Sequence, residues 1–160
     1  MDTSTNVGSA VPTPKTEELP WHAAFPVPRS SLSTATLASI PVYRLREMME
    51  EQKDVQRDFL VVDVRRTDFE DAFIQGAVNL PAHSFYPTLD SLVPILSSYK
   101  QVIFHCQSSS GRGPRTAGWY QDRLNELGIP NETSKAVVLE GGVKAWIKQF
   151  GLDDAHTVKL

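Results

Sequence analysis

Residues 104–115 read FHCQSSSGRGPR, and the order of residue types in this stretch decides the fold of the chain. Residues 102–104, Val-Ile-Phe, are apolar and largely β-branched, which predicts a buried strand that ends near Cys106. Small and polar residues follow. Gly113-Pro114 is typical of a helix start, because proline lacks the N–H that the first helical turn leaves unpaired. The stretch therefore predicts a buried strand, a tight loop and a helix.

Apolar runs and amphipathic segments alternate on both sides of this stretch. Strands are predicted over residues 59–64, 78–80, 102–104 and 136–139. Helices are predicted after Pro41, over residues 68–74, over 89–96 with an interruption at Pro94, from Gly113 to Gly128, and from Val143 to Phe150. Buried strands that alternate with helices are typical of a mainly parallel sheet with helices on both faces, so the predicted class is α/β. In such folds the functional residues lie at the carboxyl ends of the strands.

The chain divides into three predicted segments. Residues 1–37 are rich in proline, serine and threonine, which predicts a poorly ordered N-terminal tail. Residues 38–150 form the predicted domain, and residues 151–160 form a C-terminal tail. Trp21 and Phe25 lie within the N-terminal segment. We expect them to dock it on the domain, and binding of a partner protein is the alternative.

Length, charge and hydropathy exclude several classes of protein. A chain of 160 residues suits one domain with its own core. The net charge is −3, from 16 basic and 19 acidic residues, and no basic block is present, so we expect no nucleic-acid partner. No run reaches the roughly 18 apolar residues of a membrane span. The N-terminus also lacks the basic and apolar parts of a secretory signal, so we expect no membrane association.

Cys106 is the only cysteine of the chain. An internal disulfide is thus impossible, and the expected location is the cytoplasm, the nucleus or both. The four histidines show no ligand spacing, so no metal site is expected. A lone cysteine is by default a small buried apolar residue, and only its neighbours favour a reactive role.

Seven residues run from Cys106 to Arg112. The residues between these two are Gln107, Ser108, Ser109, Ser110 and Gly111. A loop between a strand end and a helix start turns its backbone N–H groups toward one point, and the helix dipole adds positive potential there. A dianion suits this cradle, and the Arg112 guanidinium is able to bind two of its oxygens at once. The same field favours the thiolate form of Cys106, so the loop is predicted to bind an oxyanion and attack its central atom. The alternative, an inert cysteine in a serine-rich turn, leaves the spacing unexplained.

Three segments of the sequence carry a family resemblance. HCQSSSGRGPR resembles the H-C-x5-R-G-P signature of the cell-division-cycle dual-specificity phosphatases built on a rhodanese fold, and equally that of small fungal relatives that include arsenate reductases. LVVDVRRTDFEDAFIQGAVNLPA is similar to the D-x-R … I-x-G-A-x-N-L-P stretch of the wider rhodanese superfamily, and LEGGVKAW to its L-x-G-G-x-x-x-W stretch. The three segments lie at residues 60–82, 105–115 and 139–146, within the predicted domain of residues 38–150, so the resemblance implies a single rhodanese-like domain.

The resemblance implies a role for each matching residue of the loop. Cys106 matches the nucleophile, and Arg112 matches the arginine that holds the oxyanion. The backbone of residues 107–111 matches the cradle. His105 matches the histidine before the nucleophile, which orients the loop rather than transferring a proton.

Other positions match the superfamily or depart from it. Asp63 and Arg65 match structural positions, which we interpret as a polar network at a strand end. Gln107 and Gly111 stand where the phosphatases carry acidic residues, and Phe73 stands where a histidine is usual. These departures leave the acid that protonates the leaving group unassigned, and they weaken the case for cyclin-dependent kinases as substrates.

The sequence predicts a cysteine-dependent phosphatase of the protein tyrosine or dual-specificity type, which forms a thiophosphate intermediate on Cys106. Its substrate would be a phosphorylated protein or a small oxyanion, with no bound cofactor. The nearest alternative is an arsenate reductase, which would need an external thiol such as glutathione, with glutaredoxin as partner. Thiosulfate sulfurtransferases of this fold resemble one another in a six-residue loop, so that activity is less expected here. A non-catalytic module that binds a phosphorylated ligand is the remaining alternative.

Overall fold

The computed structural model describes residues 8, 18–32, 36–51 and 58–160, and within these ranges five strands form one parallel sheet. Their order across the sheet is β1 (Ala38–Ile40), β6 (Lys135–Leu139), β5 (Gln101–His105), β2 (Phe59–Asp63) and β4 (Val78–Asn79). In the register of β2 and β5, Asp63 lies opposite His105. The last residues of these two neighbouring strands therefore meet at the same carboxyl edge.

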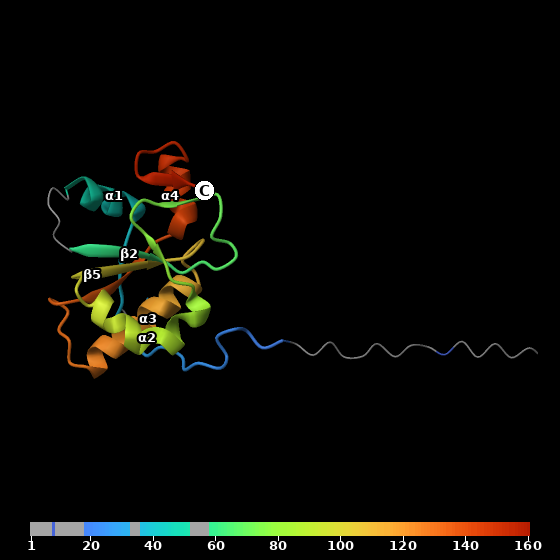
Figure 1. Cartoon of the computed structure of the whole chain (residues 1–160), viewed down its shortest axis with the longest axis vertical. Helices are drawn as coiled ribbons and strands as arrows, with labels where there is room; N and C mark the ends of the chain where they lie inside the picture. The colour runs from blue at the N-terminus through green and yellow to red at the C-terminus, as the bar shows by residue number, and fades with distance from the viewer. Residues whose placement is uncertain (1–7, 9–17, 33–35, 52–57) are drawn as a thin grey trace, which may run out of the picture.

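Helices cover both faces of this sheet (Figure 1). In the described part of the chain, α1 (Val42–Glu51) and α4 (Gly142–Phe150) lie on one face, and α2 (Ala82–Leu96) and α3 (Arg112–Glu126) lie on the other. Successive strand residues point to opposite faces. Val61 and Ile103 consequently pack with α1 and α4, whereas Val62 and Phe104 pack with α2 and α3. The predicted α/β class, with a mainly parallel sheet between helices, is confirmed.

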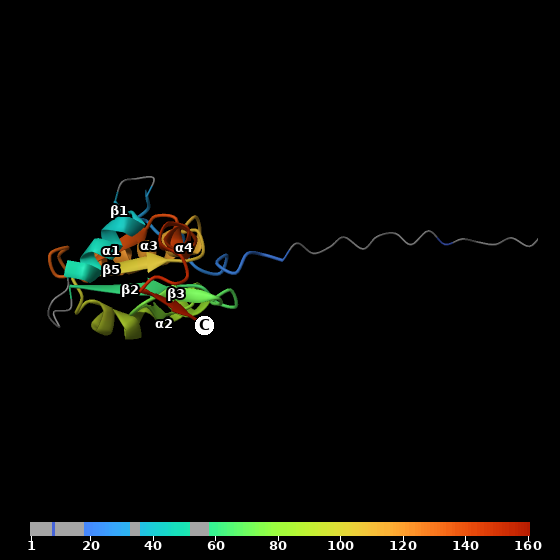
Figure 2. The same cartoon turned by 90° about the horizontal axis from the view of Figure 1, so that it is seen from above.

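The helix predicted over residues 68–74 is wrong. This segment is a series of turns that ends in β3 (Ala72–Ile74), which pairs antiparallel with β7 (Thr157–Lys159) beside the C-terminus (Figure 2). The local apolar spacing favours a helix, but pairing with a strand from the far end of the chain overrides it. The segment expected as a C-terminal tail, residues 151–160, therefore contains a strand.

α2 is longer than the sequence predicts. It runs through Pro87 and Pro94 without the interruption expected at Pro94. Both prolines lie on the exposed face of the helix, where water reaches the carbonyl groups that lose an N–H partner. The opposite face is held on the sheet by buried side chains, among them Phe85 and Leu89. Burial of this face therefore outweighs the local preference of proline for a helix end.

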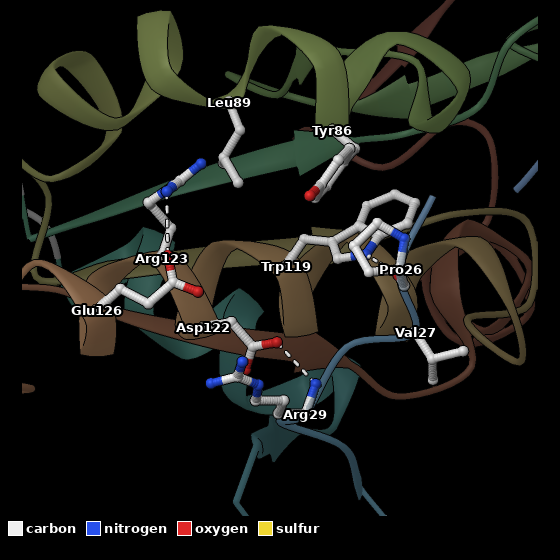
Figure 3. Close-up of a pocket in the computed structure, with 9 residues that line it drawn as sticks. All are labelled: Pro26, Val27, Arg29, Tyr86, Leu89, Trp119, Asp122, Arg123 and Glu126. Atoms are coloured by element: carbon white, nitrogen blue, oxygen red, sulfur yellow. Dashed lines mark hydrogen bonds and ion pairs between the residues drawn. The ribbon is translucent and has the colours of Figure 1, made fainter. Parts of the chain in front are cut away.

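The described part of the N-terminal segment packs on α3 (Figure 3). The indole nitrogen of Trp119 donates to the Pro26 carbonyl at 2.8 Å. The backbone N–H groups of Arg29 and Ser30 donate to the Asp122 carboxylate at 2.7 and 2.8 Å.

Aromatic side chains extend this contact. Trp21 and Phe25 both lie edge-on to Trp119, with ring centroids 6.0 and 5.9 Å apart. Residues 18–32 thus dock on the domain, whereas residues 1–7, 9–17 and 33–35 of the tail predicted over 1–37 lie outside the described residues.

Gly118 in α3 is where this segment comes closest to the helix. A Cβ atom at Gly118 would lie 2.6 Å from both Pro28 Cβ and the Ser30 carbonyl oxygen. Alanine in a helix interior gains about 1 kcal/mol over glycine, whereas such overpacking costs roughly 1–3 kcal/mol. We therefore expect Gly118→Ala to lower the midpoint of thermal unfolding and to speed tryptic cleavage after Arg29. A raised midpoint with unchanged cleavage would mean that the segment does not pack there.

Candidate active site

Cys106 follows the last residue of β5 and lies beneath the start of α3. Its side chain is buried, and the backbone N–H of Gly113, in the first turn of α3, points at Cys106 Sγ with an N–S distance of 3.4 Å. A Cβ at Gly113 would come within 3.4 Å of the Cys106 backbone nitrogen and 3.3 Å of Ser109 Oγ, so the helix approaches the loop as closely as glycine allows. The partial positive charge of the helix N-terminus therefore acts on the sulfur.

The start of α4 holds the loop from the other side. The N–H groups of Val143 and Lys144 donate to the carbonyls of Cys106 and Gln107, at 3.1 and 2.9 Å. Because N–H and C=O point in opposite directions across a trans peptide, the next two N–H groups of the loop point away from α4. This is the orientation that an anion cradle needs.

The interior of the loop contains a strained turn. Ser109 adopts a φ of +54°, which is uncommon for a residue with a side chain. It is largely buried, and no hydrogen-bond partner for its hydroxyl occurs among the described residues. The hydroxyls of Ser108 and Ser110 lie 2.8 Å apart. Strain of this kind persists only where neighbouring structure imposes it, and it is frequent at functional sites.

Arg112, the first residue of α3, is bound by a residue that the sequence analysis does not single out. Its Nη1 and Nη2 atoms donate to the two carboxylate oxygens of Asp68, at 2.7 and 2.6 Å. This hydrogen bond is the main reason why the pKa of Asp68 is lowered from 3.8 to about 2, and why the pKa of Arg112 is raised. Electrostatic interaction with Cys106 contributes further to the raised pKa of Arg112.

The lowered pKa of Asp68 sets the pH range of this ion pair. The folded state favours the charged carboxylate, so the pair stabilises the fold above the ordinary pKa of 3.8 and loses that contribution as pH falls through about 2. Asp68 is therefore ionised at every pH at which an enzyme of this kind is assayed.

Asp63 and Arg65 form a buried ion pair at the end of β2. Arg65 Nη2 lies 2.7 Å from Asp63 Oδ2, and both side chains are almost completely buried. Arg65 Nη1 and Nη2 also donate to the carbonyls of Asp68, Glu70 and Ala72, at 3.2, 3.4 and 2.9 Å. The pair therefore fixes the turns that lead to β3, and with them Asp68.

His105 is fully buried beneath the loop. Burial is the main reason why its pKa is lowered, so the ring is neutral at physiological pH. Nδ1 lies 3.0 Å from the Cys106 carbonyl oxygen and donates to it, because a carbonyl oxygen only accepts. The other ring nitrogen lies 3.7 Å from the Asp63 carboxylate. The ring thus holds the peptide that follows Cys106.

His83, near the start of α2, is a second titratable neighbour of the site. Its pKa is lowered first by burial, and then by the charges of Arg66 and Arg112. The Trp21 ring lies against it, with centroids 4.6 Å apart. His83 is therefore also neutral at physiological pH.

Two hollows lie on different sides of the molecule. One of about 270 Å³ borders the loop, and it is lined by Arg65, Asp68, Glu70, Asp71, Gln107, Val143 and Ile147. The other is the groove of Figure 3, whose walls come from α2, α3 and the N-terminal segment and include no residue of the loop. Only the first gives a ligand access to the residues beside Cys106.

Within the described ranges of the chain, no group of three or more His, Cys, Asp or Glu side chains is placed to hold a metal ion. No helix in those ranges has the length and apolar character needed to cross a bilayer.

Comparison with known proteins places this site in a family. Residues 42–149 match the rhodanese-like domain family. Arsenical-resistance protein 2 of Saccharomyces cerevisiae is 34% identical over 111 residues, which are 64% of this chain and 82% of that protein. Dual specificity phosphatase ibp1 of Schizosaccharomyces pombe is 27% identical over 105 residues, 57% of this chain and 76% of that protein. A yeast protein tyrosine phosphatase of the rhodanese family has a similar structure, with a TM-score of 0.63 and 23% identity, covering 76% of this chain and 92% of that one.

Gly142 tests whether α4 shapes the loop. It has a φ of +60°, and a Cβ there would lie 2.5 Å from the Cys106 carbonyl oxygen and 2.7 Å from that of Gln107. Because these are backbone atoms, Gly142→Ala must displace the loop or α4, and we expect inorganic phosphate to bind at least about tenfold more weakly.

Gly76 is a matched control for this substitution. Its φ is +80°, but no atom lies within 4 Å of a Cβ placed there. Gly76→Ala should therefore cost about 1 kcal/mol of stability through backbone strain alone and leave phosphate binding unchanged. Isothermal titration of both variants with phosphate measures the difference. Equal affinities would show that α4 does not shape the cradle.

Proposed function

Because the chain belongs to the rhodanese-like family, we propose that it is a cysteine-dependent phosphatase of the protein tyrosine or dual-specificity type. The observation that carries this proposal is the seven-residue loop from Cys106 to Arg112, with the sulfur under the α3 N-terminus and Arg112 as the first residue of that helix. The loop offers backbone N–H groups, a helix N-terminus and an arginine to one tetrahedral dianion. These groups stabilise negative charge as it develops on the transferring oxygens.

The reaction follows from these positions in two steps. The Cys106 thiolate attacks phosphorus, so that an S–P bond forms while the bond to the leaving oxygen breaks. Water then attacks the thiophosphate, which releases inorganic phosphate and restores the thiolate. Arg112 holds oxygens of the transferring group through both steps. The substrate class is a phosphorylated protein or a small phosphorylated compound, and the proposed place of action is the cytoplasm or the nucleus.

Arsenate reduction is the second candidate, supported by the 34% identity to Arsenical-resistance protein 2. Arsenate is a close isostere of phosphate, so the same loop suits both ions. Reduction of As(V) to As(III) needs two electrons, which come from two thiols. Cys106 is the only cysteine of the chain, so the second thiol would be external, from glutathione with glutaredoxin as partner.

A parallel assay separates the candidates. Separate samples of the purified chain receive an aryl phosphate, arsenate with glutathione and glutaredoxin, or thiosulfate with cyanide. We expect turnover of the aryl phosphate. Turnover of arsenate alone would favour the reductase, and turnover of thiosulfate alone would make the chain a sulfurtransferase. Phosphate binding without turnover of any of the three substrates would favour the remaining alternative, a non-catalytic module that binds a phosphorylated ligand.

Cys106→Ser separates attack from binding. The serine hydroxyl is a far weaker nucleophile at neutral pH, whereas the backbone groups and Arg112 remain. We expect kcat on an aryl phosphate to fall by about three orders of magnitude or more, while the inhibition constant of phosphate changes by less than about threefold. Activity near that of the wild type would contradict the covalent mechanism.

Arg112→Lys tests the planar fork of the guanidinium. Lysine keeps the positive charge but does not bind two oxygens in one plane. If the fork shapes the transition state, kcat should fall by roughly 10- to 100-fold, as when one oxyanion donor is lost. Phosphate inhibition, which rests largely on the backbone cradle, should weaken less. Unchanged steady-state kinetics would make Arg112 a structural residue.

A further inference from the structure

Arg112 is anchored from outside its own loop. Both Nη atoms bind Asp68, which lies 44 positions away in the sequence, and the two side chains retain 24% and 36% of their exposure. Asp68 is already ionised, so this is a full ion pair with a bidentate geometry. A long arginine side chain held at two atoms loses most of its rotamer freedom.

Contacts other than the ion pair with Arg112 also hold Asp68 in place. Its carbonyl accepts from Arg65 Nη1, and one carboxylate oxygen accepts from the backbone N–H of Arg66 at 3.2 Å. Arg65 in turn is locked to the buried Asp63 carboxylate. The position of the Asp68 carboxylate is therefore fixed by contacts that begin in β2 and do not involve Arg112. Asp68 thus orients Arg112, and not the reverse.

The pairing leaves part of the guanidinium available. Arg112 has five N–H bonds in one plane, and the contact with Asp68 uses one from each Nη atom. The Nε–H and the two outer N–H bonds remain for another acceptor. Arg112 directly precedes Gly113, whose N–H points at Cys106 Sγ, so the anchored guanidinium belongs to the helix start that contacts the sulfur.

We propose that Asp68 is a positioning residue that fixes the Arg112 guanidinium for the transferring oxyanion. This inference rests on the proposed function of the loop. The carboxylate repels a dianion bound nearby, so it does not improve ground-state binding. Its contribution lies in orientation, which lowers the barrier of the transfer step.

The test uses Asp68→Asn, which keeps the shape of the side chain but removes its charge. We expect kcat on an aryl phosphate to fall by about 10- to 30-fold, because Arg112 loses its anchor. Inorganic phosphate should bind about threefold more tightly, because a negative charge next to the dianion is gone. The loss of kcat should be the same from pH 5 to pH 8, since Asp68 is ionised throughout.

Three further variants make this test specific. In an Arg112→Lys background, Asp68→Asn should change kcat by less than about twofold, because the positioning effect on kcat acts through the Arg112 guanidinium. Asp68→Glu restores the charge and should recover part of kcat. Asp90→Asn removes a carboxylate from another arginine pair, formed with Arg123 at 3.0 Å between the middle of α2 and the last turn of α3, and should leave both constants unchanged.

The outcomes divide clearly. Unchanged kcat in Asp68→Asn, or a loss of kcat that persists in the Arg112→Lys background, overturns the proposal. Weaker phosphate binding with a lower unfolding midpoint also overturns it, because that result means a merely structural role. If the wild-type chain turns over no substrate, the proposed function fails separately. The positioning role is then judged on the binding of vanadate, which resembles the transition state of phosphoryl transfer: Asp68→Asn should weaken it, and equal or tighter vanadate binding in Asp68→Asn overturns the proposal.

Discussion

The buried ion pair of Asp63 and Arg65 is the constraint on which the site depends. An ion pair removed from water is costly unless all its hydrogen-bonding groups find partners. Here the Arg65 guanidinium binds the Asp63 carboxylate and three backbone carbonyls of the following turns. The side-chain amide of Asn79 completes the network, donating to the carbonyls of Asp63 and Arg65 at 3.0 and 2.8 Å. The need to satisfy one buried charge therefore determines the path of a segment that has no regular structure of its own, and so determines where Asp68 lies.

The loop from Cys106 to Arg112 is shaped by its neighbours rather than by its own contacts. It is short, rich in serine and strained at Ser109, and its internal side-chain contact is one pair of hydroxyls. Its shape comes from three sides: the N-terminus of α3 at Cys106 Sγ, the N-terminus of α4 at two carbonyls, and His105 below. The glycines at 113 and 142 allow both helices to come this close. Two helix N-termini thus converge on one loop, and this arrangement supports the proposed binding of an oxyanion.

Sequence reasoning recovers the features that depend on local pattern. Four of the five strands of the sheet follow from apolar runs, whereas β1 is not predicted, and the position of Cys106 follows from its place between a strand and a helix. It fails where distant segments decide the outcome. The turns before β3 resemble a helix until β7 pairs with them, and Asp68 has no local signal that links it to Arg112. One feature of the sequence does point to the pairing of Asp68 with Arg112. Asp68 follows the strand that neighbours the Cys106 strand, and an arginine at the carboxyl edge of the sheet favours a carboxylate partner there. The helix predicted over residues 68–74 obscured it.

The protonation states of the titratable side chains limit which reactions the described site supports. Asp68 is ionised and engaged with Arg112, so it has no proton to give. His105 is neutral and directed at a backbone carbonyl, and His83 is also neutral. The loop itself carries no carboxylate, since residues 107–111 are glutamine, serines and glycine. In the proposed reaction, none of these groups therefore supplies a proton to the group that leaves. Without such an acid the loop favours leaving groups that depart as stable anions, as aryl oxides do. An alkoxide, or the hydroxide lost when a thiol replaces a hydroxyl of arsenate, is a poor leaving group until it is protonated, so these reactions need a proton from the substrate, a second reactant or water.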